Sequence, residues 1–185
     1  MKNCILLLFA VVTAFTSQAQ ESKNEGTPKT EKLFYVEFGG ANVLFGANYD
    51  TRFKKGTRTG LGARVGVGYT IIDDETLDNN GYYTYNTRSI MTVPVGLNYV
   101  FGKSNSPHMF EAGAGATFLS KKASLYSYDD VAEPKKGNVI GHFSFMYRRI
   151  PVDGGFSWRI GFTPIINTDG QIFPSGAIGL GYAFH

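Results

Sequence analysis

From residue 33 onward, large apolar residues recur at every second position in a series of short segments. The last segment, 175–185, reads SGAIGLGYAFH, and its large residues alternate with glycine and alanine. Side chains of a β-strand point to opposite faces with a period of two, so this pattern predicts a strand with one large apolar face and one small face. No segment keeps the 3.6-residue period of an amphipathic helix.

The same alternation predicts eight strands, most of them near the roughly 9–11 residues that a tilted strand needs to cross a bilayer. Their ranges are 33–41, 43–53, 59–71, 88–101, 108–119, 139–150, 156–165 and about 173 to the end. The connections alternate in length after a tight turn at 41–42. They are short at 54–58, 102–107 and 151–155, long at 72–87 and 120–138, and intermediate at 166–173. An even number of strands then places the long connections at one end and both termini at the other.

Alternation alone fits two barrels with opposite faces. In a soluble, lipocalin-like barrel the apolar face lines the interior, whereas in a membrane barrel it faces lipid and the small polar face fills the lumen. Dense glycine on the small face suits a crowded interior, and a barrel running to the last residues leaves no strand edge open. Aromatic residues that would form an interfacial girdle gather near strand ends: Phe34, Phe53, Phe101, Phe110, Phe156, Tyr182 and Phe184. We therefore predict an all-β, eight-stranded, antiparallel up-and-down transmembrane β-barrel.

The first residues predict export. Lys2 precedes an apolar stretch from Ile5 to Val12, and small residues stand at Ser17 and Ala19, which is the pattern of a cleaved signal peptide. We expect a signal peptide at 1–19, a flexible polar periplasmic lead-in at 20–32 and the barrel at 33–185. The one cysteine, Cys4, lies inside the signal peptide, so the mature chain would have neither disulfides nor thiolate chemistry.

The signal peptide, the eight strands, the rhythm of long and short loops and the terminal GLGYAFH together resemble the small OmpA/OmpX-like outer-membrane barrels. The resemblance covers roughly residues 33–185 and implies location in the outer membrane of a Gram-negative-type bacterium, with both termini periplasmic. It also implies an insertion signal in the last strand, read by the barrel-assembly machinery. The matching residues are Ile178, Leu180, Tyr182 and Phe184, and His185 follows where the family ends on an aromatic residue.

The predicted lumen face carries charged and polar side chains that would form a network. Its members are Glu37, Asp50, Arg52, Arg64, Glu111, His142, Arg148 and Arg159. A charge in a narrow interior is costly unless it is paired. An eight-stranded interior is about wide enough for side chains alone, so we favour a plug of paired charges. A narrow path for ions is the alternative.

Other motifs carry weaker chemical hypotheses. His142 and Ser144 form a His-x-Ser pair like that of outer-membrane lipid A deacylases, but the alternation points both into the lumen, away from lipid. The acidic stretch at 73–81 lacks the spacing of a calcium-binding loop. The tyrosine-rich stretches at 81–86 and 124–130 suit a contact surface as well as ordinary loop packing. The formal net charge of +3 gives no indication of nucleic-acid binding.

We therefore expect no enzyme and no cofactor, but an integral outer-membrane protein with a plugged lumen and a structural or surface-interaction role. The second hypothesis is a narrow channel for ions or small hydrophobic molecules. A lipid A-modifying enzyme is the third. The expected partners are outer-membrane lipid and lipopolysaccharide, and the surface partner is unknown.

Overall fold

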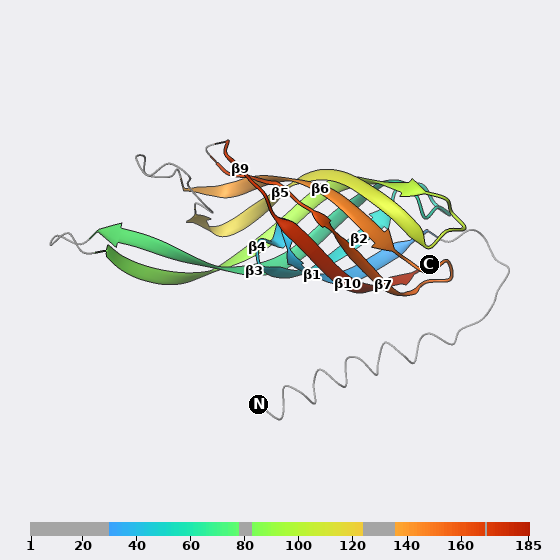
Figure 1. Cartoon of the computed structure of the whole chain (residues 1–185), viewed down its shortest axis with the longest axis horizontal. Coiled ribbons are helices and arrows are strands. Elements are labelled where there is room, and N and C mark those ends of the chain that lie inside the picture. Colours follow the sequence, from blue (N-terminus) through green and yellow to red (C-terminus); the bar gives the residue numbers. More distant parts are fainter. Residues whose placement is uncertain (1–29, 78–82, 124–135, 169) are drawn as a thin grey trace, which may run out of the picture.

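The chain forms a closed antiparallel β-barrel (Figure 1). The computed structural model describes residues 30–77, 83–123, 136–168 and 170–185. Each strand pairs with the next along the chain, and the last pairs with the first. The eight strands of the ring are β1 (Lys32–Gly39), β2 (Phe45–Arg52), β3 (Gly60–Leu77), β4 (Tyr83–Gly102), β5 (His108–Ala123), β6 (Gly137–Arg149), β7 (Gly155–Phe162) and β10 (Gly176–Phe184). The predicted fold class is therefore confirmed.

Three short elements complete the chain: the 3-10 turn η1 (Gly40–Asn42), β8 (Ile165–Ile166) and β9 (Ile172–Phe173). We call the end of the barrel that holds residue 30 and His185 the terminal end, and the opposite end the far end. The predicted signal peptide at 1–19 lies outside the described residues, and so does the lead-in as far as residue 29. Among the described residues, no helix is long and apolar enough to span a membrane.

The prediction of a long connection at 72–87 was wrong, because most of it is strand. Pairing between β3 and β4 continues outward from Ile71 opposite Ser89 to Leu77 opposite Tyr83. Figure 1 shows this hairpin reaching well past the rest of the barrel. The sequence there, DDETL, has no apolar alternation. Alternation marks strands with one buried face, so the pattern could not reveal a strand that continues beyond the barrel wall.

The seventh predicted strand, 156–165, is interrupted. β7 ends at Phe162, and β8 begins at Ile165 after Thr163 and Pro164. Proline has no backbone N–H to donate to a neighbouring strand, which accounts for the break. Beyond it, β8 pairs with Gly141 and His142 of β6, so the barrel wall continues toward the far end.

Large apolar side chains face outward, as the alternation predicted. On β3 these are Leu61, Val65, Val67, Tyr69 and Ile71, and on β4 Met91, Val93, Leu97, Tyr99 and Phe101, all exposed. The seven aromatic residues of the predicted girdle are exposed too. Six lie on the terminal-end halves of their strands, and Phe53 directly follows the terminal end of β2. The side chains of the opposite face are buried inside, where the barrel has its core.

Candidate functional site

Charged side chains fill the middle of the barrel interior. They come from six strands and are at most 5% exposed: Glu37, Asp50, Arg52, Arg64, Glu111, Arg148 and Arg159. Each lies on the face of its strand opposite the large apolar residues, so the strand alternation alone carries them inward. Four guanidinium groups and three carboxylates therefore share one enclosed space.

These groups form a continuous chain of ion pairs across the barrel. Arg148 Nη2 lies 2.8 Å from Asp50 Oδ2, and Arg148 also pairs with Glu111. Arg159 connects Glu111, at 3.2 Å, to Glu37, at 3.4 Å. Buried ions are stabilised when opposite charges and hydrogen bonds surround them, which is the case here. Arg64 lies at one end of this series of ion pairs, with its Nη1 3.9 Å from Glu37 Oε1. Arg52 lies at the other end and pairs with Asp50.

Neutral polar side chains satisfy further atoms of the network. The Tyr35 hydroxyl accepts a hydrogen bond of 2.8 Å from Arg159, whose guanidinium also lies 4.6 Å from the centre of the Tyr35 ring. Asn98 donates to Asp50, and Ser144 Oγ donates to Glu111 at 3.2 Å. The network therefore holds its members in one arrangement from several sides.

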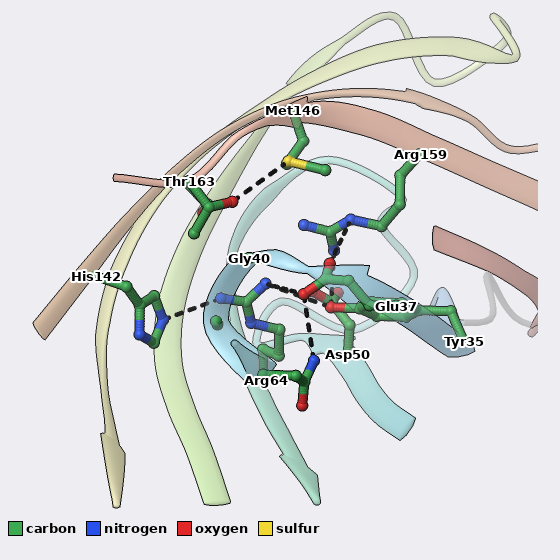
Figure 2. Close-up of polar contacts among 12 residues, drawn as sticks. Tyr35, Glu37, Gly40, Asp50, Arg64, His142, Met146, Arg159 and Thr163 are labelled. Carbon is green, nitrogen blue, oxygen red and sulfur yellow. Dashed lines mark hydrogen bonds and ion pairs between the residues drawn. The ribbon is translucent and has the colours of Figure 1, made fainter. Parts of the chain in front are cut away.

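His142 and Ser144 both lie in the lumen, but they have different partners. Arg64 donates to His142 Nε2 at 3.0 Å (Figure 2), and Nδ1 lies 3.3 Å from the Thr117 hydroxyl. Ser144 donates instead to Glu111. A nucleophilic serine needs a histidine nitrogen free to take its proton, and here that acceptor nitrogen is bonded to Arg64. The geometry assigns both residues to the polar network.

The first connection, η1, folds into the barrel instead of leaving it. Gly40, Ala41 and Asn42 are all buried, and the Thr117 hydroxyl donates to the carbonyl of Ala41 at 2.7 Å. Gly39 and Gly40 have φ angles of 71° and 63°, and a Cβ on Gly39 would lie 2.3 Å from the carbonyl oxygen of Gly176. Glycine is therefore required for the chain to turn inward here. Strand alternation did not predict this inward turn, although the small residues GGA preceding Asn42 were a signal for it.

A buried apolar layer closes the interior on the far side of the charges. It contains Ile90, Leu119, Ala123, Ile140 and Ile165, with Val43, Ile72 and Phe173 packed against it. Ile90, Leu119 and Ile140 lie two residues beyond Thr92, Thr117 and His142, and therefore on the same inward face. The sequence predicts a lumen plugged by polar and charged side chains, and the structure adds this apolar layer beside them. The same alternation, followed along each strand from the charged residues toward the far end, places these apolar residues on the inward face.

Arg58 closes the terminal end. Its guanidinium donates to the backbone carbonyls of Ser104, Ser106, Ile150 and Pro151 at 2.8–3.3 Å, and its Nε donates to the Glu31 carboxylate at 3.1 Å. An arginine has five N–H donors, and all five are used here. Arg58 thereby ties two terminal-end turns to the segment preceding β1. Burial raises the pKa of the Glu31 carboxyl above its ordinary value, against the opposing effect of nearby arginines.

The structure places all eight residues of the predicted polar network inside the barrel and brings them together, directly or through shared partners. The residues assigned to the insertion signal lie together on the outer face of β10, where Ile178, Leu180, Tyr182 and Phe184 are exposed. Sequence reasoning missed Arg58 because it stands in a turn, where periodicity carries no information.

Two solved structures have a similar barrel. The N-terminal β-barrel domain of Pseudomonas aeruginosa OprF aligns with a TM-score of 0.52 at 11% identity, over 86% of this chain and 100% of that one. This chain therefore shares the fold of that barrel domain. The Yersinia pestis outer membrane protein Ail, solved in a phospholipid bilayer nanodisc, aligns with a TM-score of 0.50 at 14% identity, over 84% of this chain and 100% of that one. No protein-family model and no curated protein matches the sequence. The resemblance to OmpA/OmpX-like barrels is thus confirmed at the level of the fold.

Proposed function

We propose that this chain is an integral outer-membrane protein with a closed interior, which acts through its surface and its place in the envelope and neither conducts nor catalyses. The exposed apolar face and the girdle at the terminal end support insertion in a bilayer. By the family's usual topology, the terminal end would be periplasmic and the long β3–β4 hairpin would lie outside the cell. Ile178, Leu180, Tyr182 and Phe184 would guide insertion by the barrel-assembly machinery, and outer-membrane lipid and lipopolysaccharide would surround the wall.

The observation that carries this proposal is the layering of the interior. Paired charges occupy the middle, η1 and the Ile90–Leu119–Ile140 layer lie toward the far end, and Arg58 spans the terminal end. Ions cross a pore only where water or mobile polar groups replace their hydration shell. A hydrophobic layer in series with an immobile ion-pair network provides neither, which supports a plug over a channel.

Conductance of the refolded chain in planar bilayers tests the plug. A shift in gel mobility between unheated and boiled samples first establishes folding, and a porin in the same bilayer serves as the positive control. We expect the folded chain to give no discrete current steps. Reproducible unitary steps from a folded sample would overturn the plug and favour the channel hypothesis.

The lipid A-modifying hypothesis has its own test. The His142 and Ser144 side chains are bonded to Arg64 and Glu111 within the lumen, whereas a lipid substrate would approach from outside. We therefore expect the acylation pattern of lipid A in cells to be the same with the wild-type chain and with Ser144→Ala. A difference between the two patterns would restore the enzymatic hypothesis.

A further inference from the structure

The outer face of the barrel has an apolar groove on its terminal-end half. It is an open hollow of about 520 Å³ on the outer wall. The outward side chains that line it are Phe101, Phe110, Ala112, Phe145, Tyr147, Ile160 and Phe162. Glu111 and Met146 alternate with these and point inward, and Gly161 has no side chain, so all three contribute backbone to its floor.

The strand register explains the groove. Ala112 lies between Tyr99 of β4 and Phe145 of β6, and one row nearer the terminal end Phe110 lies between Phe101 and Tyr147. A methyl group surrounded by large rings leaves a hollow, because strands hold their side chains upright and the rings cannot collapse into it. The shape is therefore a trough with aromatic walls.

A polar row borders the groove toward the terminal end. His108, Arg149 and Trp158 are direct cross-strand neighbours there. His108 is hydrogen-bonded to the Tyr147 hydroxyl, and the Trp158 ring lies 5.3 Å from the Tyr147 ring. Arg149 is exposed, and no carboxylate of the described residues pairs with it. Tryptophan and tyrosine favour the headgroup level of a membrane, so this row marks the level of the lipid phosphates.

The terminal end also carries a surplus of positive charge. Its exposed cationic side chains, within the described part of the chain, are Lys32, Lys54, Lys55, Lys103 and Arg149, against the single exposed acid Asp153. Glu31 and Arg58 pair with each other and add no net charge. An anionic headgroup is therefore the complementary ligand at this end.

We infer that the groove and the His108–Arg149–Trp158 row bind one anionic phospholipid of the adjoining leaflet. An acyl chain lies in the trough over Ala112, and the phosphate lies against the Arg149 guanidinium, whose planar fork matches phosphate oxygens. Both walls of the trough contact the acyl chain. The acyl chain therefore gains dispersion contacts that it would lack on a flat surface. This inference rests on the membrane location proposed above.

The single tryptophan of the chain, Trp158, is a built-in reporter. The full barrel is refolded into phosphatidylcholine vesicles that contain a small fraction of lipid with brominated acyl chains, which quench tryptophan on contact. We expect brominated phosphatidylglycerol to quench Trp158 more strongly than brominated phosphatidylcholine at equal mole fraction. The expected preference is about fivefold, the effect of roughly one basic residue at an anionic surface.

Two variants separate the two parts of the site. Arg149→Gln removes the guanidinium, and we expect it to abolish the preference for phosphatidylglycerol. Ala112→Phe fills the trough, and we expect it to weaken quenching by both lipids. The matched controls are Lys54→Gln, which removes an exposed cation elsewhere at the same end, and Ala114→Phe, which lies two residues along the same outward face but outside the groove. Both controls should behave as wild type.

Equal quenching by the two brominated lipids in the wild-type barrel would overturn the inference, and so would an unchanged preference in Arg149→Gln. Each sample is checked for the gel-mobility shift of a folded barrel and for co-flotation with the vesicles. A chain that folds and inserts but shows no preference refutes the lipid site alone. A chain that does not associate with the vesicles refutes the proposed membrane location.

Discussion

Replacing Arg148 by methionine tests whether paired charges hold the barrel together. Arg148 is fully buried and bridges Asp50 and Glu111, so its removal leaves two carboxylates without their shared partner. Methionine keeps most of the volume, which limits the cavity. The next residue, Arg149, points outward and is exposed, so Arg149→Met is a matched control on the same strand.

The expected effect follows from the contacts that remain. Removing one partner of a buried ion pair costs about 3–5 kcal/mol. In Arg148→Met, Asp50 still pairs with Arg52, and Glu111 still pairs with Arg159. We therefore expect the loss in the free energy of unfolding to lie near the lower limit of that range, at about 3 kcal/mol. With a slope of about 2 kcal/mol per molar urea, the unfolding midpoint falls by about 1.5 M. Arg149→Met should change the free energy of unfolding by no more than about 0.5 kcal/mol.

Unfolding of the refolded barrel in detergent micelles is followed by Trp158 fluorescence and by the gel-mobility shift. A double-mutant cycle with Glu111→Gln then measures the coupling directly, because the two side chains are in contact. The reasoning is refuted if Arg148→Met unfolds at the wild-type midpoint, or if Arg149→Met is destabilised equally. A coupling energy near zero would mean that the Arg148–Glu111 ion pair does not stabilise the folded barrel.

Further outcomes concern the terminal end and the lumen. Arg58→Ala should lower the free energy of unfolding by about 3 kcal/mol, because the buried Ile150 carbonyl and the Glu31 carboxylate lose their donor. Lys54→Ala, which removes an exposed side chain of the same turn, should be neutral in the same assay. The raised pKa of Glu31 gives a pH dependence with a definite sign. The neutral acid is favoured in the folded state, so its stabilising contribution is present below about pH 4.5 and is lost as the pH rises through the raised value. The urea midpoint of the wild-type barrel relative to Glu31→Gln should therefore fall as the pH rises above about 4.5, and a rise would contradict the raised pKa. His142→Ala should remain silent in planar bilayers, because the apolar layer and Arg58 still close both ends; new current steps would show that His142 itself blocks a path.

Strand alternation predicted much of the barrel, and the reason is geometric. The period of two separates the faces wherever one face meets lipid and the other a packed interior. The period alone therefore assigns Arg64 and Glu111 to the inside and Val65 and Phe110 to the outside. These assignments do not require knowing which residues the side chains contact. The same rule failed at 72–87, where the β3–β4 hairpin continues past the barrel wall without such a pattern.

The sequence by itself determined which side chains face inward, where the tight turns fall and that the interior charges need partners. Only the tertiary structure decided which charges pair, because closure and stagger of the barrel bring together Asp50 and Arg148, 98 positions apart. It also decided that η1 turns inward and that Arg58 binds the carbonyls of distant turns. The Arg58 contacts depend on backbone carbonyls, which every residue carries, so residue types give no sign of which turns Arg58 binds.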